Sequence, residues 1–241
     1  MKIKILGNGG AINDGLPYNS FIINDGFLIE SPPDIIGSIF REKIDPQKIS
    51  AIFISHFHAD HYFGLPFLFL RLFFEESGNS IIVIGPDGIE NKVREICNIA
   101  FGANHPMQKW IGKHVIYKEI KNMQEIHVDS HYRLRPIEMF HFTETYGFIL
   151  ESDGDKVAYF ADTYWKNSLL EYVEDVDTII VDLNGEKTDK TKVHISENDL
   201  LKYALPKTKG SVRFYGTHLR DNKISENGRI QYLKFGDEIY I

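Results

Sequence analysis

The chain has 241 residues, 43% of them hydrophobic and 25% charged, which is typical of a globular protein and excludes an intrinsically disordered one. Its formal net charge of −7 at pH 7 gives no overall basic footprint for nucleic acid. Cys97 is the only cysteine, so no internal disulfide can form, and we expect a reducing, cytoplasmic location.

The first third of the chain predicts strands separated by turns. Residues 2–6 alternate like a half-buried strand and run into Gly7-Asn8-Gly9-Gly10 without the apolar core of a signal peptide. These glycines predict a tight turn, since the Lys-Ser/Thr of a phosphate-binding loop is missing. Residues 18–24 and 27–30 predict a hairpin around Asp25-Gly26, and residues 33–43 predict a helix.

Four metal-binding side chains then fall within Ser55-His56-Phe57-His58-Ala59-Asp60-His61. They follow the apolar run 51–54, which predicts a buried strand, and precede residues 62–74, which are apolar enough for a helix. His56 and His58 point the same way because side chains two apart in extended backbone share a face. Asp60 and His61 fall where the helix begins and the chain turns. One short loop can therefore supply two neighbouring metal positions.

This pattern, His-x-His-x-Asp-His directly after a strand, resembles the hallmark of the metallo-β-lactamase-fold hydrolase superfamily. The resemblance implies an α/β fold of the αββα sandwich type, with two mixed β-sheets flanked by helices in a single domain over residues 1–241. Members usually carry an aspartate where the second hairpin strand ends. Here the stretch is Ile29-Glu30-Ser31-Pro32-Pro33-Asp34, so Glu30 and Asp34 are alternatives for that position, and neither is assigned as a ligand.

The middle of the chain alternates between strand and helix, as an α/β sandwich does. Residues 65–76 predict a strongly apolar helix, for which core burial, a homodimer face and the wall of an apolar pocket are alternatives. The run 67–74 is too short to span a bilayer. Residues 81–86 predict a buried strand and residues 88–100 a helix, and short strands follow between 115 and 139. His105, His114, His127 and His131 occur at spacings that specify nothing.

Three later motifs continue the resemblance, and it extends from the first strand to His218. His141 precedes the strand that begins Tyr146-Gly147, as in the branch containing RNase Z and the cyclic ribose-phosphate phosphodiesterase of phosphonate breakdown. Asp162-Thr163 follows the strand 157–160 and resembles the motif whose aspartate bridges two metals. Thr217-His218 ends the strand 211–216 and matches the last motif.

The resemblance implies the following ligand set. His56, His58 and His141 hold one metal; Asp60, His61 and His218 hold a second; Asp162 bridges them. Two divalent ions per chain are therefore expected, zinc first, with manganese or iron as alternatives. Two cations about 3.5–4 Å apart share a hydroxide nucleophile and stabilise charge on the attacked centre. Asp60 can also orient or deprotonate that water.

A further histidine is predicted to protonate the leaving group. The strand 178–182 ends in Asp182, residues 185–192 predict a polar loop, and His194-Ile195-Ser196-Glu197 opens a helix with Ser196 as its N-cap. In the branch named above, a histidine at this point lies at the site without binding metal. We therefore expect His194 to be a general acid oriented by Asp182. The alternative is a surface histidine before a helix. Residues 224–241 add one or two strands.

The sequence thus predicts a metal-dependent phosphodiesterase acting on a small substrate, a cyclic nucleotide or sugar phosphate. Between His141 and Asp162 there is room only for a pair of strands, with no inserted arm to grip tRNA. Hydrolysis of a lactone, β-lactam or thioester is the alternative; tRNA 3′-processing and non-haem iron redox chemistry are less favoured. Neither a nucleic acid nor a membrane is expected as a partner, and a homodimer is left open.

Overall fold

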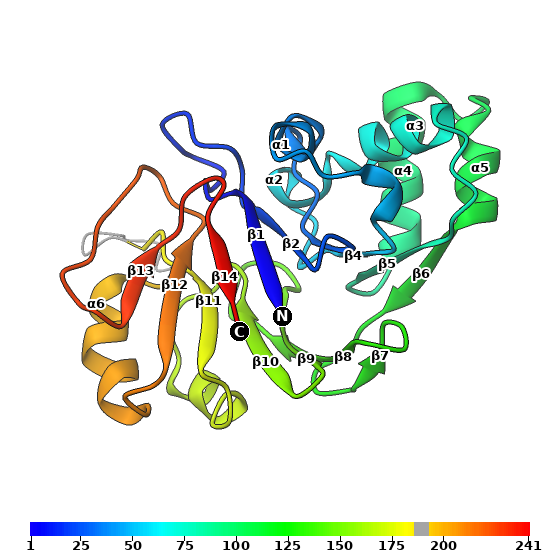
Figure 1. Ribbon diagram of the computed structural model, residues 1–241. Helices are drawn as coiled ribbons and strands as arrows, with labels where there is room; N and C mark the ends of the chain where they lie inside the picture. The colour runs from blue at the N-terminus through cyan, green and yellow to red at the C-terminus, as the bar shows by residue number, and fades with distance from the viewer. Residues whose placement is uncertain (186–192) are drawn as a thin grey trace.

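The computed structural model describes residues 1–185 and 193–241. Over these residues two seven-stranded sheets face each other, and helices cover their outer faces (Figure 1). The predicted αββα sandwich is confirmed. The first sheet has the order β14-β1-β2-β3-β4-β5-β6: Glu238–Tyr240, Lys2–Gly7, Ser20–Ile23, Phe27–Ile29, Ala51–Phe53, Ile81–Gly85 and Val115–Glu119.

The second sheet has the order β13-β12-β11-β10-β9-β8-β7. Its strands are Ile230–Tyr232, Arg213–Thr217, Thr178–Asp182, Asp155–Phe160, Tyr146–Ser152, Arg133–Glu138 and Ile126–His127. Strands β10 to β13 run parallel, whereas β8 and β9 pair antiparallel. The carboxyl ends of β8, β10, β11 and β12 therefore lie at one edge of the sheet. Figure 1 shows β1 and β14 side by side, with both chain ends close together.

Strand periodicity explains how the first sheet faces two cores. In β2, Phe21 and Ile23 pack between the sheets, whereas Ile22 between them packs under the helices. Strands β3 and β4 repeat this alternation. The helices over the outer face are α1 (Ile35–Arg41), α3 (Leu65–Phe74), α4 (Ile89–Phe101) and α5 (Met107–His114). Cys97 lies buried in α4, where burial raises the pKa of its thiol to about 12.

Two helical details differ from the prediction. Residues 107–114 form a helix, α5, that was not expected. The predicted helix over 62–74 is divided, because α2 (Ala59–Tyr62) ends before α3 begins at Leu65. Gly64 lies at the division, where a Cβ would fall 2.0 Å from the carbonyl oxygen of Pro32. The backbone of residues 31–32 packs against this gap and receives the Gly64 N–H at Ser31 O.

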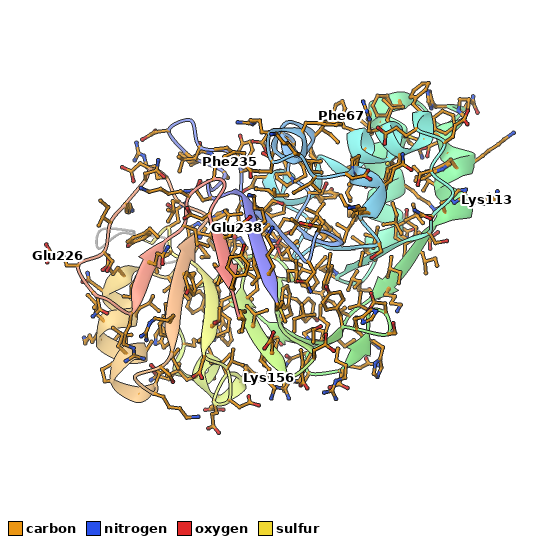
Figure 2. All side chains as sticks on the ribbon, viewed as in Figure 1. Phe67, Lys113, Lys156, Glu226, Phe235 and Glu238 are labelled. Atoms are coloured by element: carbon orange, nitrogen blue, oxygen red, sulfur yellow. The ribbon has the colours of Figure 1, made fainter. Side chains whose placement is uncertain are left out.

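Helix α3 is both a core element and an exposed face. Its Leu65, Leu68 and Leu72 are buried, whereas Phe67 and Phe74 are half-exposed or more and line an apolar groove beside α1. Figure 2 shows Phe67 at the outer surface of this helix layer. Among the described residues, no helix combines the length and apolarity needed to cross a membrane.

The second sheet is covered by short helical segments. They are the 3₁₀ helix over Asn167–Tyr172 and α6 (Glu197–Asp199). Helix α6 continues into a π-helical turn over Leu200–Ala204 and a 3₁₀ turn over Leu205–Lys207. A further 3₁₀ turn, Pro46–Lys48, precedes β4. Ser196 caps α6 and exchanges hydrogen bonds with Asp199, so the predicted N-cap is confirmed. The predicted polar loop lies, beyond Gly185, outside the described residues.

Candidate metal centre

The structure brings all seven predicted ligand residues together at the edge where strands of both sheets end. Four come from the segment after β4, which runs from His56 into α2. The others follow β8, β10 and β12. Ligand-type atoms of the first group lie within 4.8 Å of one another, as do those of the second. The first group contains His56, His58, His141 and Asp162; the second contains Asp60, His61 and His218.

In the first group, three imidazoles converge on one carboxylate oxygen. Nε2 of His56 lies 2.8 Å from Nδ1 of His58, which lies 3.5 Å from Nε2 of His141. Nε2 of His141 is 4.0 Å from Oδ2 of Asp162. Burial and the neighbouring His61 and His58 hold the pKa of His56 well below its usual range. This imidazole is therefore neutral, which is the form that binds a metal.

In the second group, two imidazoles face two carboxylates. Nε2 of His61 lies 3.4 Å from Oδ2 of Asp60, and Nε2 of His218 lies 3.3 Å from the same oxygen. Both nitrogens also approach Oδ1 of Asp162, at 3.4 and 3.5 Å. The two oxygens of Asp162 are thus directed to different groups, Oδ2 to the first and Oδ1 to the second. This is the geometry that a bridging carboxylate needs.

Unsatisfied atoms indicate that these residues suit divalent cations. Among the described residues, both ring nitrogens of His61, Nδ1 of His141, Nδ1 of His218 and Oδ1 of Asp162 are buried without a hydrogen-bond partner. Burial opposes a charged His218, but Asp162 and Asp182 outweigh it and raise its pKa to about 10. Without a bound cation, the proton on His218 thus supplies the positive charge that faces these carboxylates. Imidazole nitrogens with carboxylate oxygens are a donor set that fits zinc, manganese or iron.

The structure also places His194 and Asp182 beside this cluster. Nδ1–H of His194 donates to Oδ2 of Asp182 at 2.6 Å, and Oδ1 of Asp182 lies 3.4 Å from Nδ1 of His218. The ring of His194 is 5.3 Å from that of His218 and 6.1 Å from that of His141. Burial opposes protonation of His194, but Asp182 outweighs it and raises the pKa of the imidazole.

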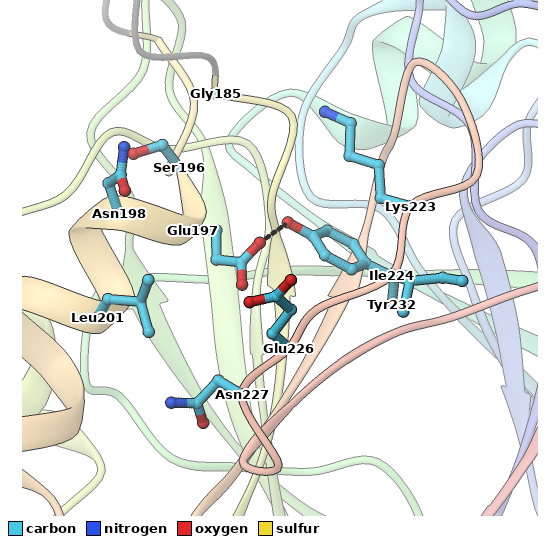
Figure 3. A pocket seen from close by; sticks show the side chains of 10 residues that line it. All are labelled: Gly185, Ser196, Glu197, Asn198, Leu201, Lys223, Ile224, Glu226, Asn227 and Tyr232. Carbon is cyan, nitrogen blue, oxygen red and sulfur yellow. Dashed lines mark hydrogen bonds between the residues drawn. The ribbon is translucent and has the colours of Figure 1, made fainter.

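Figure 3 shows a pocket lined by Ser196 and Glu197, which follow His194 in the chain, and its contacts hold this segment. The carboxylate of Glu197 accepts hydrogen bonds from the hydroxyls of Tyr232, at 2.8 Å, and Ser225. Helix α6 is thereby attached to β13 and to the loop before it. Together with the Ser196 cap, these contacts fix the chain two residues after His194.

The structure distinguishes the two candidate carboxylates near the end of β3. Glu30 is fully buried, and its Oε1 lies 3.3 Å from Nδ1 of His61, on the ring edge away from the other ligand atoms. Asp34 instead accepts from the backbone N–H of Tyr18. Glu30 therefore occupies the position beside the ligands. Its spacing from the histidine motif carried no signal, because the contact depends on β3 pairing with β4.

Backbone conformation at the site is unusual at two non-glycine residues. Glu30 and His218 have φ of 61° and 60°, in the left-handed region that most side chains avoid. Such strain is of order 1–3 kcal/mol each and persists where surrounding structure enforces it. Gly10 explains part of that enforcement, since a Cβ there would lie 2.9 Å from the His218 ring. The glycine turn after β1 thus packs against the candidate centre.

Comparisons with known proteins agree with this geometry. A family model described as "Anti-Pycsar protein Apyc1" matches residues 1–239. A curated Ribonuclease Z from Borreliella burgdorferi (strain ZS7) is 29% identical over 164 residues, covering 63% of this chain and 49% of the relative. The chain therefore spans about half the length of this curated relative.

Two solved structures show the same fold over nearly the whole chain. A diphosphatase from the PhnP family has a TM-score of 0.74 at 20% identity, with 100% of this chain and 97% of that one covered. Zn²⁺-bound PqqB from Methylobacterium extorquens has a TM-score of 0.77 at 14% identity, with both chains fully covered. The resemblance to metallo-β-lactamase-fold proteins is thus confirmed at the level of fold.

Proposed function

We propose, from the premise that the chain belongs to the Anti-Pycsar protein Apyc1 family, that it is a dinuclear metal-dependent phosphodiesterase acting on a small phosphodiester. A cyclic nucleotide or a sugar phosphate is the substrate class. The ligand set is the one predicted from the sequence, with Asp162 as the bridge. We also propose that residues 1–241 form one domain, since both sheets share a core.

The observation that carries this proposal is the contact between His194 and Asp182 at the edge of the ligand cluster. Hydrolysis of an activated acyl group needs no such residue, whereas expulsion of a sugar alkoxide needs a proton donor. Nδ1 of His194 is occupied by Asp182, which leaves Nε2 to deliver a proton to the leaving oxygen. Asp182 also raises the pKa of His194, which favours the protonated form that a proton donor needs.

The remaining residues have roles that follow from their positions. Two bound divalent ions would supply a hydroxide nucleophile at neutral pH and offset phosphate charge. Asp60 is directed at the second ligand group through Oδ2, where it can orient or deprotonate the attacking water. Asp182 contacts both His194 and His218, so one carboxylate orients the proton donor and a ligand.

A small substrate is favoured by what separates His141 from Asp162. A short loop, the hairpin of β9 and β10 and its two-residue turn fill this interval, and no arm is inserted. The net charge of −7 also disfavours a polyanion such as tRNA. Because a Ribonuclease Z is among the relatives, the assay must also include precursor tRNA.

The test is a substrate panel on purified protein whose metal content has been measured. Cyclic nucleotides, a sugar cyclic phosphate, precursor tRNA, a lactone, a β-lactam and a thioester are compared by kcat/KM. We expect the small phosphodiesters to exceed the acyl substrates and tRNA to be cut poorly. Efficient lactone hydrolysis without phosphodiesterase activity would replace this proposal with the acyl alternative. A clean tRNA 3′-end cut would overturn the size argument.

Elemental analysis of the same preparation tests the cofactor. We propose two ions per chain, with zinc first and manganese or iron as alternatives. A single iron with oxygen consumption would indicate redox chemistry instead. The homodimer and the cytoplasmic location stay predictions. The exposed Phe67 and Phe74 face of α3 is the candidate dimer surface, which light scattering of the wild type and of Phe67→Glu tests.

A further inference from the structure

A chain of buried polar contacts lies beneath the second ligand group, and the catalytic roles proposed above do not use it. It begins at Glu30, whose Oε2 accepts the backbone N–H of Ser55 at 3.2 Å. The other oxygen, Oε1, lies 3.3 Å both from Nδ1 of His61 and from the hydroxyl of Tyr159. Glu30, His61 and Tyr159 all have an exposed fraction of 0%. A carboxylate buried to this extent requires donors on every side.

Tyr159 connects Glu30 to the opposite end of the centre. Its hydroxyl accepts from Nδ2 of Asn19 at 2.9 Å, and Oδ1 of Asn19 accepts from Oγ1 of Thr217 at 2.7 Å. Thr217 immediately precedes His218. The chain of contacts therefore joins two histidines of the second ligand group, one from each sheet, through side chains that are at most 1% exposed.

Donor and acceptor identities direct the hydrogen bonds of this chain toward Glu30. The Asn19 amide nitrogen only donates, so the single hydroxyl proton of Tyr159 is directed to Glu30. Burial and the adjacent Glu30 raise the pKa of Tyr159 well above its usual range, which keeps that proton in place. Glu30 is thereby held as an acceptor, and the atom facing it on His61 is Nδ1. A proton on Nδ1 leaves the Nε2 lone pair free to bind a cation.

We propose that Tyr159 is a positioning residue for the second metal position. Its hydroxyl holds Glu30 against Nδ1 of His61, and through Asn19 it holds Thr217 beside His218. The inference rests on the proposed function only through the presence of bound metal, and not through the reaction catalysed. Loss of the hydroxyl releases both supports at once, so the affinity of one ion falls while the other, held by His56, His58 and His141, is retained.

Tyr159→Phe tests this with a matched control. The ring of Tyr159 packs against Phe21 and Phe148 at 5.2 and 5.5 Å, and phenylalanine keeps those contacts. Tyr132→Phe is the control, because the Tyr132 hydroxyl also accepts from an asparagine amide, Asn24 at 2.9 Å, in the same core. Zn²⁺ affinities are measured by competition with a chromophoric chelator, alongside thermal unfolding of the metal-free proteins.

We expect Tyr159→Phe to weaken one of the two Zn²⁺ sites by about 10–100-fold, the range for residues that orient a ligand, and Tyr132→Phe to leave both unchanged. Equal affinities in wild type and Tyr159→Phe would overturn the inference. Should Tyr159→Phe not fold, Thr217→Val breaks the far end of the same chain and is compared with Thr217→Ser, which keeps the hydroxyl. The inference then requires the loss in valine alone.

The same preparations separate this inference from the proposed function. Wild type that binds two Zn²⁺ ions but cleaves no phosphodiester contradicts the phosphodiesterase, and the affinities of the variants still decide the role of Tyr159. Conversely, a wild-type phosphodiesterase whose Tyr159→Phe variant binds both ions normally retains the proposed function and removes the positioning role.

Discussion

The two sheets contribute to the candidate centre in opposite ways. The first sheet supplies four ligand-type residues from one continuous segment, His56 to His61, that follows a single strand. The second sheet supplies His141, Asp162, Asp182 and His218 from the ends of four different strands. The first contribution is local in the chain, whereas the second exists only once the sheet has assembled.

The loop after β4 and the residues from the second sheet therefore have different structural roles. The local segment supplies most of the proposed ligands and depends on one loop conformation. The dispersed residues each reach a place that the loop cannot: Asp162 between the two groups, and Asp182 between His194 and His218. Substitutions of Asp162 and Asp182 should therefore have effects that cross between groups, while substitutions of single residues in the loop should stay within one.

The largest expected effect is loss of the bridge. Asp162→Ala should lose occupancy at both metal positions, because its two oxygens are directed to different ligand groups. His58→Ala, in the local segment, should weaken only the first position. Metal stoichiometry by elemental analysis after dialysis measures both. Retention of two ions by Asp162→Ala would contradict the bridging role.

His194→Ala should affect the reaction without affecting the metals. General acid catalysis is worth roughly 10²–10⁴-fold, and we expect a loss in kcat of that size on an alkyl phosphodiester. On bis-nitrophenyl phosphate, whose leaving group departs as an anion, the loss should be much smaller. Equal losses on both substrates would argue against proton donation, and loss of metal would make His194 a ligand.

Asp182→Asn should move the pH profile in a defined direction. His194 acts in its protonated form, so kcat on the alkyl ester falls as pH rises through the pKa of the imidazole. Asp182 raises that pKa; without its charge, the alkaline limb should shift to lower pH. The loss at neutral pH should be milder than for His194→Ala. Metal content is measured in parallel, since Asp182 also lies 3.4 Å from His218. An unshifted limb would remove the electrostatic role.

Ser196→Ala should have the smallest effect. The Ser196 hydroxyl accepts the N–H of Asp199 at the start of α6, and loss of such a cap costs about 1 kcal/mol of stability. Denaturant unfolding should show this decrease. Both metals should be retained, because the cap supports the segment after His194 and no ligand. A loss of metal in this variant would mean that the segment after His194 also supports the ligand residues, contrary to this prediction.

The local half of the centre could be predicted from the sequence because its information is local, and its ligand roles stay predictions. His56 to His61 follow a buried strand, and their spacing predicts which of their side chains point the same way. His141, Asp162 and His218 were placed by the order of motifs, and sheet topology explains why that order works: each follows a strand ending at the same edge. The sequence also predicted that Asp182 orients His194, twelve residues away; the structure places the two side chains in contact, and their joint role stays a proposal.

What the sequence did not predict depends on contacts between distant segments. Glu30 meets His61 only because β3 pairs with β4, and Tyr159 meets Asn19 only because the two sheets pack face to face. The division between α2 and α3 arises at Gly64 because the backbone of Pro32 needs the space that a side chain would fill. Helix α5 has only eight residues, and its turns are stabilised by packing, as where the indole of Trp110 donates to Ser77 O.

The single cysteine, Cys97, can report how often the helix layer over the first sheet opens. Cys97 lies on the buried face of α4, in the core between the first sheet and the helices, and its raised pKa leaves almost no thiolate at neutral pH. A thiol reagent can therefore modify it only during moments when this layer opens. The rate of modification in native protein reports the frequency of that opening. Comparing the rate of Cys97 modification with and without zinc tests whether bound ions also stabilise the helix layer on the far side of the first sheet.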